Sequence, residues 1–158
     1  MNVIEQINSH KYLFLTEIGE PEENVLRIVI EEGKLSEPTK EENITESNEA
    51  LKSIIAGSRE IMSDESCYLY EIVFDTYIAY SVRNESYAIP EDSSEFSGGF
   101  FGTYSKSSFL DYLKISTFAT EDYPGKFVHY GLSVFRYFID IASVYEPEMK
   151  ILRFPKEN

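Results

Sequence analysis

The chain has 158 residues, 42% hydrophobic and 15% aromatic, which is the composition of a single globular domain with its own core. Its 28 acidic and 14 basic side chains give a net charge of −14, which disfavours binding to nucleic acids or anionic membranes. The only cysteine, Cys67, excludes a disulfide framework within the chain and favours a reducing compartment. Neither a signal peptide nor a membrane-spanning apolar run is visible, so we expect a cytoplasmic protein.

The N-terminal segment predicts one short helix followed by two strands. Apolar residues at helical spacing indicate a helix within Met1–Ser9. Alternation of side chains predicts strands over His10–Ile18 and Asn24–Glu32, with a turn at Glu20–Glu23 between them. We expect these elements to belong to one domain that spans residues 1–158.

The next segment has weaker signals. Residues 31–49 are polar, acidic and poor in aromatic side chains, which predicts a long loop or a weakly ordered insertion. Residues 51–62 are ambiguous, and alternation around Gly57 favours a strand or a strand bent at that glycine.

The stretch YEIVFDTYIAYSVRNESY, Tyr70 to Tyr87, is dense in tyrosine and β-branched residues. Side chains at Tyr70, Ile72 and Phe74 fall on one face of a strand, which we expect to be buried. The pattern predicts two strands joined by a tight turn or bulge near Asp75-Thr76. One long bent strand is the alternative.

The C-terminal half continues with a predicted loop over Pro90–Gly99 and a helix over Ser108–Phe118. Ser108 is the expected N-cap, with Asp111 completing a capping box. Further strands are predicted over 127–133, 134–144 and, at an edge, 149–154. Because strands occur in blocks, we predict an α+β fold, with a mainly antiparallel sheet of at least five strands and one or two helices packed against it.

Signatures of catalysis or of cofactor binding are missing. The glycine run Gly98–Gly102 has no phosphate-loop pattern and indicates a turn with a strand start. His10 and His129 have no metal ligands at zinc-site spacing. A Cys67–His129 nucleophile pair is open, although an inert buried thiol is the commoner case. We therefore expect no catalytic residue, no metal, no cofactor and no enzymatic activity.

One acidic residue stands out because it lies inside an apolar segment. Asp140 is flanked by isoleucines, and burial of an unpaired carboxylate is costly. We therefore expect Asp140 to pair with Arg83 or Arg136. A structural role for this pair is favoured over general acid–base chemistry.

The tyrosines and acidic residues around the same stretch suit a protein-binding surface. Tyrosine is enriched at interfaces, and acidic neighbours attract a basic partner. Core packing remains the first alternative for each tyrosine. The predicted partner-binding residues are Tyr77, Tyr80, Arg83, Glu85, Tyr87, Glu91, Asp92 and Glu95.

Two blocks of the sequence resemble a known kind of protein. They are EIVFDTYIAYSVRNESYA, Glu71 to Ala88, and HYGLSVFRYFIDIASVYEP, His129 to Pro147. Together they resemble small bacterial proteins, some of which are encoded beside polymorphic toxins and look like immunity proteins. The resemblance implies a protein that binds and neutralises a cognate basic toxin domain. The alternative is a non-catalytic small-molecule or peptide-binding domain with an aromatic pocket.

Overall fold

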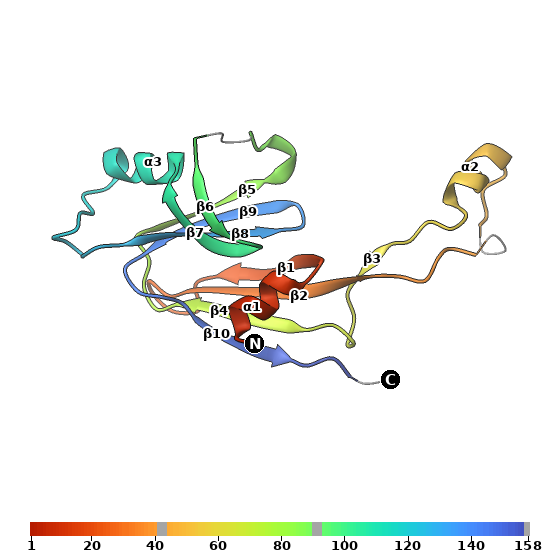
Figure 1. Cartoon of the computed structure of the whole chain (residues 1–158), viewed down its shortest axis with the longest axis horizontal. Coiled ribbons are helices and arrows are strands. Elements are labelled where there is room, and N and C mark those ends of the chain that lie inside the picture. The colour runs from red at the N-terminus through yellow and green to blue at the C-terminus, as the bar shows by residue number, and fades with distance from the viewer. Residues whose placement is uncertain (41–43, 90–92, 157–158) are drawn as a thin grey trace.

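The computed structural model describes residues 1–40, 44–89 and 93–156. In these ranges, two antiparallel sheets of five strands each lie face to face, and three short α-helices accompany them (Figure 1). The predicted α+β class with a mainly antiparallel sheet is therefore confirmed. None of the helices in the described ranges is long and apolar enough to cross a membrane.

The elements are distributed over the two sheets as follows. The first sheet contains, in spatial order, β1 (Tyr12–Gly19), β2 (Leu26–Leu35), β4 (Leu69–Phe74) and β10 (Glu148–Arg153), and the short β3 (Ile61–Met62) pairs with β2. The second sheet contains β5 (Ala79–Asn84), β9 (Tyr137–Ser143), β8 (Val128–Val134), β7 (Phe101–Lys106) and β6 (Glu95–Gly98). The helices are α1 (Val3–Ser9), α2 (Glu49–Ile55) and α3 (Ser108–Ser116), and a 3-10 turn covers Glu85–Tyr87.

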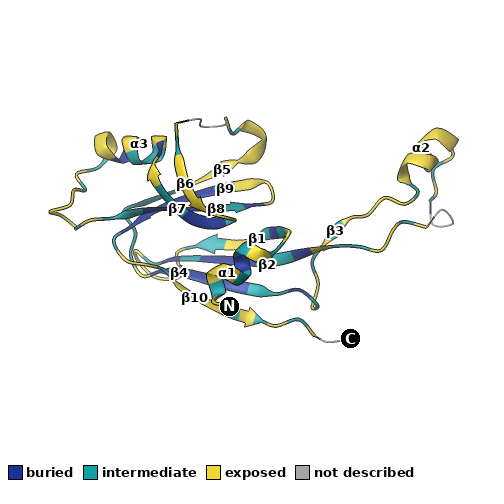
Figure 2. Ribbon diagram, in the orientation of Figure 1, coloured by how far each residue is buried: buried dark blue, intermediate teal, exposed yellow. Residues whose placement is uncertain are grey.

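The core lies between the sheets (Figure 2). Because successive side chains of a strand point to opposite faces, every second residue of the central strands is buried there. From the first sheet come Ile28, Tyr70, Ile72 and Phe74, and from the second come Tyr130, Leu132, Ile139 and Ile141. Burying one such side chain stabilises the fold by roughly 1.5–3 kcal/mol, so this layer holds the sheets together.

The Tyr70–Tyr87 stretch forms two strands, as predicted, but they do not pair with each other. β4 lies in the first sheet between β2 and β10, whereas β5 lies at the edge of the second sheet beside β9. The link between them crosses the sandwich, and it is held where the Ile78 N–H donates to the Ala142 carbonyl. Ser143 Oγ also donates to the Thr76 carbonyl at 2.8 Å. The segment near Asp75-Thr76 is therefore a crossover between layers and not a hairpin turn.

Three other predictions of secondary structure differ from the structure in part, and residues 41–43 and 90–92 of the two predicted loops lie outside the described ranges. β2 continues to Leu35, so it occupies the start of the predicted loop at 31–49. Residues 49–55 form α2 instead of a strand, because the Asn48 side chain caps the helix by accepting from two backbone N–H groups. β6 occupies part of the loop predicted over 90–99, where it pairs with β7.

The segment that carries α2 projects away from the sandwich (Figure 1, Figure 2). None of the residues of α2 is buried. Backbone hydrogen bonds between its two sides close the base of this arm, where Ser36 N–H donates to Glu60 O and Thr39 N–H donates to Ser58 O. The helix thus adds nothing to the core between the two sheets.

A buried carboxylate links three strands of the first sheet on its outer face. Glu71 of β4 accepts hydrogen bonds from Lys150 of β10 and Arg27 of β2, each at 2.5 Å. These two cations lower the pKa of the Glu71 carboxyl. The pairing allows a nearly buried carboxylate on the outer face, where it has little contact with water.

Close packing in the β6–β7 hairpin yields a prediction. A Cβ atom at Gly102 would lie 2.2 Å from the Ser97 carbonyl oxygen and 2.6 Å from the Phe96 ring. We expect Gly102→Ala to lower the free energy of unfolding by about 1–3 kcal/mol in urea titrations, because the hairpin must shift. Gly19→Ala is the matched control, since no atom lies within 4 Å of the position that a Cβ would occupy there. Equal stability of the two variants would contradict this packing.

Candidate functional site

The outer face of the second sheet carries the principal cluster of buried polar side chains in the described ranges. Tyr130, Ile139 and Ile141 point into the core, so their neighbours His129 and Asp140 point to the opposite face. Ser107 reaches the same place from the junction of β7 and α3. The exposed fractions of Ser107, His129 and Asp140 are 3%, 1% and 4%.

These side chains form a continuous hydrogen-bonded series, which we call the polar chain: Ser107, His129, Asp140 and Arg83. Ser107 Oγ lies 2.8 Å from His129 Nδ1, and His129 Nε2 lies 2.9 Å from Asp140 Oδ1. Asp140 Oδ2 accepts from Arg83 Nε at 3.1 Å and lies 3.0 Å from Nη2. The series therefore connects α3 with strands β8, β9 and β5.

The partners of His129 determine the position of its proton. A carboxylate paired with an arginine only accepts hydrogen bonds. In the neutral ring, Nε2 therefore carries the proton and donates the hydrogen bond to Asp140. Nδ1 is then the acceptor for the Ser107 hydroxyl. Ser107 Oγ in turn accepts from the Leu110 N–H at 3.1 Å, which makes Ser107 the N-cap of α3.

The N-cap of α3 is therefore Ser107, and the prediction of Ser108 was wrong by one residue. Asp111 does not complete a capping box, because its side chain pairs with Lys114 at 2.8 Å. The hydroxyl of Ser107 meets both the helix and the histidine, whereas Ser108 is displaced by one position along the helix. Accepting from a backbone N–H of the first turn is what defines the cap.

Aromatic rings enclose His129. Its ring stacks on Tyr104, with centroids 4.4 Å apart, and contacts Phe109 at 4.8 Å. The Tyr104 ring packs directly against the backbone of Gly131 on the neighbouring strand. A Cβ atom at that glycine would lie 2.5 Å from the ring, so a larger residue there would displace Tyr104. The imidazole is thereby fixed between two rings, with its nitrogen atoms directed at Ser107 and Asp140.

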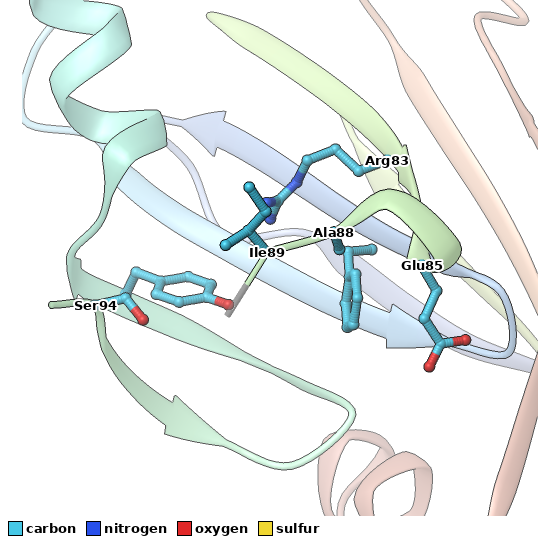
Figure 3. Close-up of a pocket in the computed structure, with 7 residues that line it drawn as sticks. Arg83, Glu85, Ala88, Ile89 and Ser94 are labelled. Carbon is cyan, nitrogen blue, oxygen red and sulfur yellow. The ribbon is translucent and has the colours of Figure 1, made fainter. Parts of the chain in front are cut away.

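A groove opens above the polar chain. One hollow of about 310 Å³ is lined by Ser81, Arg83, Tyr104, Ser107, His129 and Asp140, together with residues of α3. A second hollow of about 410 Å³ is lined by Arg83, Glu85, Ala88, Ile89, Ser94, Tyr104 and Phe138 (Figure 3). Arg83 and Tyr104 line both hollows, so we treat these as one groove between the 85–89 segment and α3.

The predicted partner-binding residues divide into separate groups. Tyr77 and Tyr80 form an edge-to-face pair at 5.2 Å and pack against the core. The Tyr77 hydroxyl donates to Glu20, and this hydrogen bond raises the pKa of the tyrosine to about 12. Both rings thus pack against the core, which was the alternative to partner binding for each tyrosine.

The remaining predicted residues have different places. Arg83 and Glu85 line it, and Tyr87 is exposed on the 3-10 turn beside it. Glu95, on β6, accepts a hydrogen bond of 2.6 Å from Ser105. Glu91 and Asp92 lie outside the residues that the structure describes.

Asp140 pairs with Arg83, which confirms one of the two predicted partners. Arg136 is not the partner, because it lies in the β8–β9 turn with a positive φ of 74° and its guanidinium sits over the Phe135 ring. Cys67 is buried, and its thiol lies 3.9 Å from Asp64. Since the partners of His129 are Ser107 and Asp140, no Cys67–His129 pair exists.

The association of Ser107, His129 and Asp140 was not predicted from the sequence. One signal was available: a β8–β9 hairpin places His129 and Asp140, 11 residues apart, on the same outer face. Ser107 carried no comparable signal, because its approach depends on how α3 packs. Among the described residues, no group of three or more His, Cys, Asp or Glu side chains is arranged to hold a metal ion.

Comparisons of the chain with protein-family models, with curated proteins and with solved structures found no match. The fold and the site by themselves define an antiparallel α+β sandwich with a polar, aromatic-lined groove on one outer face.

The double role of Ser107 gives a prediction on stability. Ser107→Ala removes the cap of α3, which costs about 1 kcal/mol, and leaves His129 Nδ1 without its donor. We expect the free energy of unfolding to fall by about 1–3 kcal/mol in denaturant titrations. Ser116→Ala is the control, because that serine is exposed in the last turn of α3. An unchanged stability of Ser107→Ala would contradict the capping role.

Proposed function

We propose that the protein binds a basic partner protein through the rim of the groove, and that this partner is a toxin domain which it neutralises. The observation that supports binding is the exposure of large apolar side chains that line the groove or lie within a few residues of its lining. The exposed fractions are 85% for Tyr87, 83% for Ile89, 56% for Tyr112 and 86% for Ile115. Exposed apolar groups gathered in one region mark interaction surfaces.

The two sides of the rim have separate origins. Tyr87 and Ile89 belong to the segment that follows β5, and Ile89 lines the second hollow. Tyr112 lines the first hollow from α3, and Ile115 lies one turn further along the same helix. A partner segment that enters the groove would bury these side chains on both sides.

Charge supports a basic partner. The net charge of −14 repels acidic proteins and accelerates encounter with basic ones. The identification of that partner as a toxin domain rests on the resemblance of residues 71–88 and 129–147 to immunity-type proteins. Binding alone suffices for such a role, since blocking a toxin domain needs no chemistry from the inhibitor.

The dimensions of the groove favour a second candidate function. Hollows of about 310 and 410 Å³ are within the range of small-molecule sites, and aromatic rings with a few convergent polar groups are typical of such sites. A small-molecule or peptide ligand would contact Arg83, Tyr104 and Phe138, which lie on the floor, rather than the outer rim.

Binding kinetics against the product of the neighbouring toxin-like gene tests the first candidate. We expect Tyr87→Ala to accelerate dissociation about tenfold with little effect on association, because an exposed anchor is lost. Tyr145→Ala is the control, because it makes the same substitution at an exposed tyrosine outside the groove. Equal dissociation rates for both variants would contradict the proposed surface.

Charge is tested in the same experiment. Glu85→Gln combined with Glu95→Gln should slow association and reduce its salt dependence, because charge steering is screened by salt. Glu22→Gln combined with Glu23→Gln is the control, because it removes the same amount of charge from the β1–β2 turn of the other sheet. It should slow association less than the variant beside the groove. Absence of a complex, or association that is indifferent to salt, would count against the proposal.

A further inference from the structure

We propose that the groove also has an acyl-transfer activity, in which Ser107 attacks the carbonyl carbon of a small carboxylic ester. This inference goes beyond partner binding and does not depend on it, because the chemistry needs the buried side chains of Ser107, His129 and Asp140, which the proposed partner contacts do not use. The sequence predicted no enzymatic activity, but folding brings together Ser107, His129 and Asp140, which are separated along the chain.

The geometry is that of a nucleophile with its base and an orienting acid. Ser107 Oγ lies 2.8 Å from His129 Nδ1, and His129 Nε2 lies 2.9 Å from Asp140 Oδ1. Both distances are within the range of roughly 2.6–3.2 Å that proton transfer requires. Asp140 fixes the proton on Nε2, so the nitrogen facing Ser107 is the one that is free to accept.

The position of Ser107 at the start of α3 favours negative charge on the reacting oxygen atoms. The Leu110 N–H already donates to Ser107 Oγ at 3.1 Å. Phe109 lies in the same turn and lines the hollow, and its N–H is one of the first-turn donors that have no acceptor within the helix itself. Helix N-termini stabilise anions, so this N–H is the candidate donor to the oxyanion of the intermediate.

The hollow beside the polar chain defines the class of substrate. Its volume of about 310 Å³ accommodates a small molecule and not a folded domain. Tyr104, Phe109 and Tyr112 contribute aromatic rings to the lining, which suits a short or aromatic acyl group. An uncharged ester also avoids the repulsion that a chain of net charge −14 exerts on anionic substrates.

The reaction is balanced without any cofactor. Ser107 Oγ forms a bond to the carbonyl carbon while its proton passes to His129 Nδ1. The ester C–O bond then breaks, and the same proton passes from Nδ1 to the leaving alcohol. A water molecule attacks the acyl-serine and gives a proton to Nδ1, after which the bond to Ser107 breaks, Oγ regains its proton and the carboxylic acid leaves.

Asp140 and Arg83 act as positioning residues in this scheme. Asp140 holds the tautomer of His129 through Nε2, and Arg83 holds the carboxylate through two contacts near 3 Å. An asparagine at position 140 is able to offer its amide N–H to Nε2, which would favour the opposite tautomer. Nδ1 would then carry a proton and be unable to accept one from Ser107.

The experiment uses the full chain with an alkyl fluorophosphonate and with p-nitrophenyl acetate. We expect the fluorophosphonate to modify the folded native protein on Ser107, as located by peptide mass spectrometry. Ser107→Ala should lose both this adduct and hydrolysis of the ester, whereas Ser116→Ala should retain both. Asp140→Asn should lower kcat about 100-fold or more with KM little changed, while the circular dichroism spectrum and the unfolding transition show that the variant is folded; loss of folded protein would instead appear in those two measurements.

Native protein that gives no adduct on Ser107 would overturn the proposal, and this result does not depend on whether any variant folds. Ester hydrolysis that survives Ser107→Ala would overturn it as well. Either result leaves partner binding untouched, because kinetics with the neighbouring gene product measure the rim independently of Ser107.

Discussion

The buried carboxylate of Asp140 is the constraint on which the outer face of the second sheet depends. It lies on β9, between β5 and β8, and it is almost completely removed from water. A carboxylate in that position costs several kcal/mol unless it is paired and hydrogen-bonded. Arg83 of β5 and His129 of β8 supply the two partners, so one side chain couples three adjacent strands.

The consequences extend from the sheet to the groove. His129 donates its Nε2–H to Asp140, so its Nδ1 faces the N-terminus of α3. There it contacts the hydroxyl of Ser107, which also caps the helix. Tyr104 completes the arrangement by stacking on His129 over Gly131. The floor of the groove is therefore a hydrogen-bonded series enclosed by aromatic rings, whereas large apolar side chains beside it are exposed.

Alternation in the sequence predicted most strands, because burial of one face leaves a period of two in the side chains. It also indicated that Asp140 needs a cation. Alternation shows which face of a strand is buried but not which strand pairs with it. It could therefore not predict that the chain crosses from one sheet to the other after Phe74. The seven-residue α2 has too few turns to distinguish its period from that of a strand. Ser107 was missed because its contact with His129 is set by packing between distant segments.

The state of the His129 ring is the most direct test of this account. Long-range proton–nitrogen NMR of the imidazole, near neutral pH, reports which nitrogen carries the proton. We expect the neutral ring to carry a slowly exchanging proton on Nε2 and none on Nδ1, and we expect Asp140→Asn to favour the opposite tautomer. A proton on Nδ1 in the native protein, or rapid exchange between tautomers, would contradict the polar chain from Arg83 to Ser107.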